Sequence, residues 1–205
     1  MQTHAEETTI DDKLKRVANV LRWTGWASFW VQLILLAVTS LMLMLAISGR
    51  TFNRAIEPTA LGGRIVTLNQ GATPGIGIAI FWAGCGILAL SFALFIAFRQ
   101  TRLAKRLFNS NVVNHPQKSE VLQFLRWGAI VGLVGMFLTI LGGGTSIGVL
   151  LSKSIAQPQG VAIYNPTRII RSLDIFVAAA NMNGIAGHFV GTVTYLGLIN
   201  WLNRE

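Results

Sequence analysis

Four apolar stretches, each long enough to cross a lipid bilayer as a helix, dominate this sequence of 205 residues. Spanning the hydrocarbon core takes roughly 20 consecutive apolar residues in an α-helix, and the stretches cover residues 23–48, 75–98, 127–151 and 173–201. They are apolar around the whole helix and lack the polar face of a soluble amphipathic helix. The sequence therefore predicts an all-α, polytopic membrane protein with four transmembrane helices.

The charged residues agree with this interpretation and indicate what the protein contacts. Only 12% of the chain is charged, against about 25% in soluble domains. The net charge of +9 could indicate nucleic acid, but the basic residues flank the apolar stretches, where they meet anionic lipid headgroups. We therefore expect a bilayer with anionic headgroups as a partner, and no nucleic acid. Because Cys85 is the only cysteine, an intramolecular disulfide is excluded.

The first 22 residues hold four acidic and four basic side chains and no short apolar core with a cleavage site. They predict an uncleaved cytoplasmic segment (1–22) ahead of the transmembrane domain (23–205). Eleven of the 17 Lys and Arg residues lie in this segment, between the second and third stretches, or at the C-terminus, and six lie in the other two loops. By the positive-inside rule, both termini are expected to face the cytoplasm.

A short repeat suggests two related helical hairpins. "VLRWTG" at 20–25 and "FLRWGA" at 124–129 each open an apolar stretch that is followed by a loop and a second stretch. Parallel repeats occur in transporters. The alternative is that Leu-Arg-Trp is a good interface anchor, because Arg snorkels and Trp prefers the headgroup level.

Glycines indicate how the helices pack. Small residues four apart allow close helix approach in lipid, so Gly128 and Gly132 are expected to bring the third helix close to the fourth, which carries Gly187 and Gly191. The triple glycine at 142–144 costs helix stability, and we expect a kink or an unwound turn there.

Polar residues recur every seventh position of the fourth stretch, at Asp174, Asn181, His188 and Tyr195. Seven residues make nearly two helical turns, so the four lie on one narrow stripe, and Asn183 points the opposite way. Asp174 and His188 are about 21 Å apart along the axis, which places Asp174 near the outer interface and His188 near the bilayer midplane. Polar groups at that depth usually face a bundle interior or a cavity.

This stripe is the candidate transport path, with His188 and, more weakly, Cys85 of the second stretch as candidate metal ligands. Structural roles fit the same residues. Asp174 could cap the fourth helix or pair with Arg171, Asn181 could bond between helices, and His188 could donate to a carbonyl of a neighbouring helix. No HxxxH or CxxC pair is present, so one protomer offers few ligands for a tight metal site.

The segment "RSLDIFVAAANMNGIAGHFVG", the opening "LRWTGWASFWVQ" and the order of four helices resemble a family of cyanobacterial and plastid membrane proteins. The resemblance runs from about residue 12 to 203. It implies a four-helix membrane protein with both termini on the cytoplasmic or stromal side. The plant members are described both as a chloroplast inner-envelope iron permease and as a subunit of the inner-envelope protein-import translocon.

Two functions follow as expectations. The first is a permease for iron or a related divalent metal, with the metal as substrate and no resident cofactor. The alternative is a non-transporting subunit of a protein translocon, or an assembly factor for a membrane complex. Nucleophile–base pairs and paired acids are lacking, so we expect no enzyme. The resemblance to a bacterial member implies the plasma or thylakoid membrane, with a homo-oligomer or a larger complex as possible assemblies.

Overall fold

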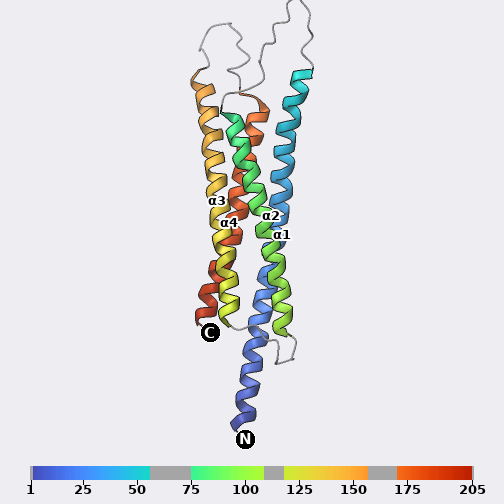
Figure 1. Ribbon diagram of the computed structural model, residues 1–205, viewed down its shortest axis with the longest axis vertical. Helices are drawn as coiled ribbons and strands as arrows, with labels where there is room; N and C mark the ends of the chain where they lie inside the picture. Colours follow the sequence, from blue (N-terminus) through green and yellow to red (C-terminus); the bar gives the residue numbers. More distant parts are fainter. Residues whose placement is uncertain (1, 56–74, 109–117, 157–169, 205) are drawn as a thin grey trace, which may run out of the picture.

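The computed structural model describes residues 2–55, 75–108, 118–156 and 170–204, and the side chains of 15–49, 75–105, 118–156 and 170–204. These residues form four α-helices (Figure 1). In chain order they are α1 (Gln2–Ala55), α2 (Ile76–Phe108), α3 (Lys118–Ile155) and α4 (Ser172–Arg204). All four are long and apolar enough to cross a membrane. The predicted fold class is therefore confirmed, and the chain is an integral membrane protein.

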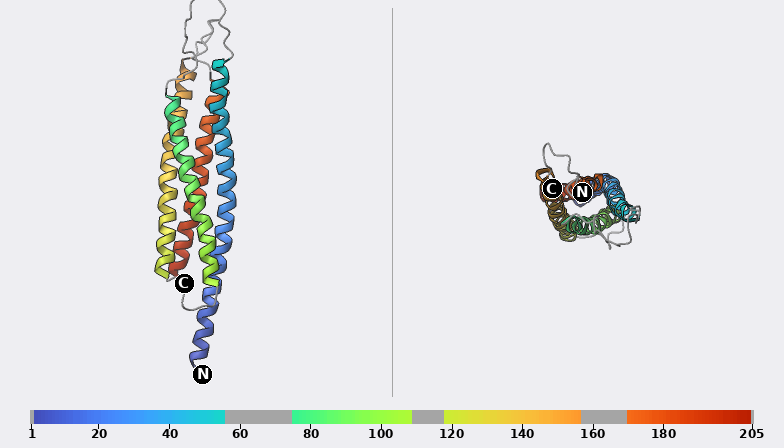
Figure 2. Two further views of the ribbon diagram at one scale, coloured as in Figure 1. Left: turned by 45° about the vertical axis from the view of Figure 1, so that its right-hand side comes forward. Right: turned by 90° about the horizontal axis from the view of Figure 1, so that it is seen from above.

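The helices run along the long axis of one bundle, in alternating directions, so both termini lie at the same end (Figure 1). Seen along the axis, neighbours in sequence are neighbours in space, and α4 closes the ring against α1 (Figure 2). Across the ring, α2 and α4 contact each other. The first part of α1 projects beyond the other helices (Figure 1).

The bundle buries many small and polar side chains together with some leucines, and it turns many of its bulky apolar side chains outward. Alanines such as Ala79, Ala93 and Ala180 are almost completely buried, whereas Leu88 and Phe81 are 71% and 63% exposed. Lipid tails are as apolar as leucine, so helix association in a membrane relies on close packing of small residues. The outer surface of the bundle is thus suited to hydrocarbon.

Two helix starts have identifiable causes. Gly75, just before α2, has a φ of 87°, a left-handed conformation that glycine adopts without strain, and its carbonyl accepts the Ile78 N–H at 3.1 Å. At the start of α4, the Asp174 carboxylate accepts the backbone N–H of Arg171 at 3.2 Å. A side chain that reaches back in this way satisfies a donor left over in the first helical turn.

The helices extend beyond the boundaries that hydropathy predicted. α1 includes the segment 2–22 and ends at Ala55, and α2 and α3 continue into the basic stretches that flank their apolar parts. Hydropathy marks only the portion that fits the hydrocarbon core, whereas helical hydrogen bonding continues past it. The side of the membrane on which 1–22 lies, and the hairpin repeat, stay predictions.

The prediction of an unwound turn at the triple glycine is wrong. α3 continues as an α-helix through residues 142–144. Gly142 and Gly143 are buried, and Gly142 lies against Asn181 of α4. Tertiary packing therefore outweighs the poor helix propensity of glycine at this point.

Candidate functional site

The four stripe residues of α4 all lie inside the bundle. Asp174, Asn181, His188 and Tyr195 have 1–2% of their surface exposed. Their seven-residue spacing turns them to one side of the helix, which faces α3. Asn183 lies on another side of α4 and donates to the Met42 sulfur of α1 at 3.5 Å.

Three of these side chains sit in notches that glycines leave in α3. Gly128, Gly135 and Gly142 are also seven residues apart. A Cβ built on Gly128 would overlap the Tyr195 ring, one on Gly135 would overlap the imidazole of His188, and one on Gly142 would overlap the Asn181 amide. The two helices are antiparallel and share one period, so each large polar side chain meets a position without a side chain. We call these positions the glycine notches.

Two threonines make further contacts with glycines of neighbouring helices. Thr139 of α3 extends its methyl group toward Gly184 of α4 and Gly86 of α2, where a Cβ would overlap it. Thr192 of α4 lies against Gly132 of α3, where a Cβ would overlap its hydroxyl oxygen. Hydroxyl groups on these threonines bond carbonyls of their own helices, so the interhelical contacts are made by close approach.

His188 bridges α4 to α2 near the middle of the bundle. Its Nε2 lies 3.2 Å from the carbonyl oxygen of Gly86. A carbonyl only accepts, so Nε2 carries the proton and a neutral ring keeps a lone pair on Nδ1. Among the described residues, Nδ1 has no hydrogen-bond partner. The structure therefore holds the ring by one nitrogen, and the lone pair of the other nitrogen lies buried beside Gly135 of α3.

Asn181 is held within its own helix. Its amide nitrogen donates to the Val177 carbonyl at 3.0 Å and approaches Ser146 Oγ of α3 at 3.5 Å. Its Oδ1 lacks a partner in the part of the chain that the structure describes. An acceptor is thus left over about two turns from His188, on the same side of α4.

Asp174 forms a buried ion pair with Lys153 of α3. The ammonium lies 2.5 Å from the carboxylate, and the two side chains are only 6% and 2% exposed. The expected partner, Arg171, contributes its backbone N–H to the same carboxylate oxygen. The charge of Asp174 is therefore matched inside the bundle.

Several other buried acceptors lack a partner among the described residues. A polar atom left unpaired in an apolar interior costs free energy unless water or another ligand satisfies it. The atoms belong to α1, α2 and α4. They are Gln32 Oε1, Thr39 Oγ1, Gln100 Oε1 and Tyr195 Oη, in addition to the two on Asn181 and His188.

The remaining predicted residues are distributed over different contacts. Gly128 and Gly132 face α4, whereas Gly187 lies against Leu90 of α2 and Gly191 against Gln32 of α1. The four glycines therefore do not form one α3–α4 contact. Cys85 is a half-buried free thiol, and no group of three or more His, Cys, Asp or Glu side chains in the described ranges could hold a metal ion.

Sequence reasoning missed the partners of the stripe on other helices. Lys153, Gly135 and Gly86 were not identified as its partners, although two signals were present. The glycines at 128, 135 and 142 have the same spacing as Asn181, His188 and Tyr195. Lys153 is a charge directly after the third apolar stretch, and it needed a partner.

The fold and this interior define an integral membrane protein, a four-helix bundle that encloses a row of buried polar side chains. This polar row consists of the stripe residues Asp174, Asn181, His188 and Tyr195 of α4. The chain belongs to the family described as Protein of unknown function (DUF3611), whose model matches residues 11–203. It is similar to "Protein TIC 21, chloroplastic" of Arabidopsis thaliana, with 27% identity over 204 residues. The match covers 95% of this chain and 60% of that protein's length, and no solved structure matches. These matches confirm the resemblance to the cyanobacterial and plastid family.

Proposed function

We propose that this protein is a permease for iron or a related divalent metal cation, and that the bundle described here is a closed state of the path. The observation that carries the proposal is the arrangement of His188. Metal-binding histidines almost always donate their second ring N–H to a carbonyl, carboxylate or water. His188 has this arrangement, with Nε2 on the Gly86 carbonyl and Nδ1 left over inside the bundle.

The other unpartnered buried atoms suit the same substrate. Gln32, Thr39, Asn181 and Tyr195 supply oxygen acceptors, and imidazole nitrogen with oxygen is a donor set that first-row divalent metals accept. A conducted ion must bind weakly enough to leave again. Scattered single ligands meet that condition better than a tight three-ligand site does.

The buried ion pair explains why we describe the state as closed. Lys153 and Asp174 lie at the end of the polar row that is farther from the termini. In an open state, Asp174 would exchange Lys153 for a cation that enters from outside. This proposal places the termini in the cytoplasm, as the distribution of basic residues predicts.

The test is metal uptake by proteoliposomes that contain only this protein, with an enclosed metal-sensitive dye and Fe²⁺ kept reduced. We expect His188→Ala to lower the initial uptake rate about tenfold or more, the scale on which changes around a metal-binding histidine act. The matched control is Asn183→Ala, on the same helix but outside the row, which should keep the wild-type rate.

Protein content per liposome and thermal unfolding separate a transport defect from loss of the fold. His188→Gln, which keeps a polar side chain of similar size, serves as a second variant. Wild-type uptake by both His188 variants at equal protein content would disprove the role of His188. A wild-type protein that transports no metal would favour the second candidate function.

That candidate is a non-transporting membrane subunit of a protein translocon or an assembly factor, and the tryptophans of α1 favour it. Trp23 and Trp30 are 76% and 53% exposed, and Trp26 stacks on Trp30 at 6.1 Å between ring centroids. Aromatic belts sit at headgroup level, yet Trp30 lies about 10 Å further along α1 than Trp23. An aromatic cluster of that depth suits contact with another membrane protein.

A further inference from the structure

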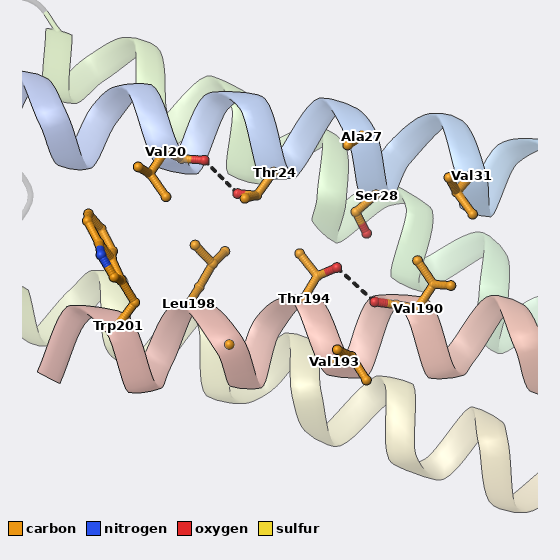
Figure 3. Close-up of a pocket in the computed structure, with 11 residues that line it drawn as sticks. Val20, Thr24, Ala27, Ser28, Val31, Val190, Val193, Thr194, Leu198 and Trp201 are labelled. Atoms are coloured by element: carbon orange, nitrogen blue, oxygen red, sulfur yellow. Dashed lines mark hydrogen bonds between the residues drawn. The ribbon is translucent and has the colours of Figure 1, made fainter. Parts of the chain in front are cut away.

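A groove of about 420 Å³ runs along the outside of the bundle between α1 and α4 (Figure 3). Its walls are mostly valines and small residues of the two helices, and Trp201 lies at one end. The volume falls within the range of ligand sites in proteins. The groove is separate from the polar row, which faces α3.

The groove presents an apolar surface even where it carries hydroxyl groups. Thr24 donates to the Val20 carbonyl at 2.7 Å, and Thr194 donates to the Val190 carbonyl at 2.8 Å (Figure 3). The Ser28 hydroxyl accepts from Gln32 at 2.8 Å. Because these polar atoms are already bonded, and none of the described residues that line the groove is charged, a hydrocarbon chain suits it better than a polar ligand.

The length of the groove corresponds to one leaflet. On α1 it extends from Val20 to Val31, about 16 Å along the helix, and half of a hydrocarbon core of about 30 Å is about 15 Å. On α4 it begins at Val190, two residues from His188, and ends at Trp201 near the C-terminus. It therefore reaches from mid-bundle to the end that carries both termini.

Basic side chains stand where the groove reaches that end. Arg16 lies four residues before Val20 on α1, and Arg204 lies three residues after Trp201 on α4, so each continues the face of its helix that lines the groove. Both side chains are exposed. Basic residues at this level attract anionic headgroups, and Trp201 has the amphipathic ring that favours the interface.

We propose that the groove between α1 and α4 is a binding site for one anionic phospholipid. An acyl chain lies along the groove, and the phosphate lies between Arg16 and Arg204. The chemistry that selects the ligand is the combination of an apolar channel one leaflet long with two cations at its mouth. A second membrane helix fits less well, because it would continue past the midplane, where the groove ends.

The test is native mass spectrometry of the delipidated full-length protein, titrated with phosphatidylglycerol or with phosphatidylcholine of the same acyl chains. The wild-type protein should bind one phosphatidylglycerol more tightly than phosphatidylcholine. The double variant Arg16→Gln with Arg204→Gln should weaken phosphatidylglycerol about thirtyfold, since each basic residue near a membrane surface contributes about a fivefold factor. Its phosphatidylcholine affinity should stay the same.

A filled groove provides an independent test. A Cβ added at Gly197, in the groove wall, would meet nothing within 4 Å, so Gly197→Phe should fill the groove and abolish the tight phosphatidylglycerol site. The matched control is Gly148→Phe on α3, where a Cβ also meets nothing within 4 Å and the groove is untouched. This control should bind lipid as the wild type does.

Three outcomes would overturn the proposal. The first is wild-type phosphatidylglycerol affinity in Gly197→Phe, and the second is unchanged affinity in the double arginine variant. The third is a dimer that disappears in Gly197→Phe while lipid binding persists, which would assign the groove to a second copy of the chain. Thermal unfolding shows whether Gly197→Phe folds; if it does not, the double arginine variant decides.

Discussion

The absence of a side chain at Gly135 determines how closely the imidazole of His188 can approach α3. The ring occupies the place where a Cβ would stand, and its Nε2 reaches the Gly86 carbonyl on α2 from there. The lack of a Cβ at Gly135 of α3 thus sets the position of His188 Nε2, which faces α2. Close packing makes such a dependence sharp, because the interior has little room for adjustment.

Gly135→Ala should therefore destabilise the bundle by about 1–3 kcal/mol, the usual cost of overpacking a tight interior. Gly144→Ala on the same helix is the matched control, because a Cβ there meets nothing within 4 Å. It should be neutral or stabilising by up to about 1 kcal/mol, since alanine is the better helix former. Thermal or denaturant unfolding in detergent measures both. Equal stability of the two variants would contradict the tight contact at His188.

The sequence predicted which residues of α4 share a side, but not what they contact. The common direction of Asp174, Asn181, His188 and Tyr195 follows from the helical period alone. Their partners depend on the rotation and register of α2 and α3, which the spacing within α4 does not contain. Lys153 shows the difference, because its role becomes visible only when α3 and α4 lie side by side.

At the scale of helices, the Lys153–Asp174 pair joins the end of α3 to the start of α4. Removing one member of a buried pair leaves an uncompensated charge, so Lys153→Met should cost about 3–5 kcal/mol of stability. The double variant Lys153→Met with Asp174→Leu should recover most of that loss, because it removes both charges. A double-mutant cycle of unfolding free energies measures the coupling. Additive losses would show that the two charges act independently.

Element boundaries were the weakest part of the sequence-based description. Hydropathy located the four helices but placed the start of α1 at residue 23, whereas it begins at Gln2. The residues before 23 are polar and charged, and hydropathy carries no information on whether polar residues are helical outside the membrane. At the glycines 142–144, the low helix propensity of glycine predicted an unwound turn, but the packing of α3 against α4 outweighs that propensity.

At the scale of the whole molecule, an even number of spans places both termini at one end (Figure 1). The excess of Lys and Arg predicts that this end is cytoplasmic. A green fluorescent protein fused to the C-terminus should therefore fluoresce in a bacterial host, and an alkaline phosphatase at the same position should be inactive. Phosphatase inserted between residues 157 and 169 should be active. The reversed pattern would overturn the orientation.

The glycine notches have a consequence for motion, because a pattern that repeats every seven residues fits its partner in more than one register. If α4 slid along α3 by seven residues, about 10 Å, His188 would enter the notch at Gly142 and Tyr195 the notch at Gly135. Thr139 would meet Gly191 in place of Gly184. Two contacts oppose that slide: Thr192 would lose Gly132, and Asp174 would move outward past the end of α3 and leave the buried Lys153 ammonium behind. The glycine notches thus fit α4 in two registers, and the Lys153–Asp174 ion pair selects one of them.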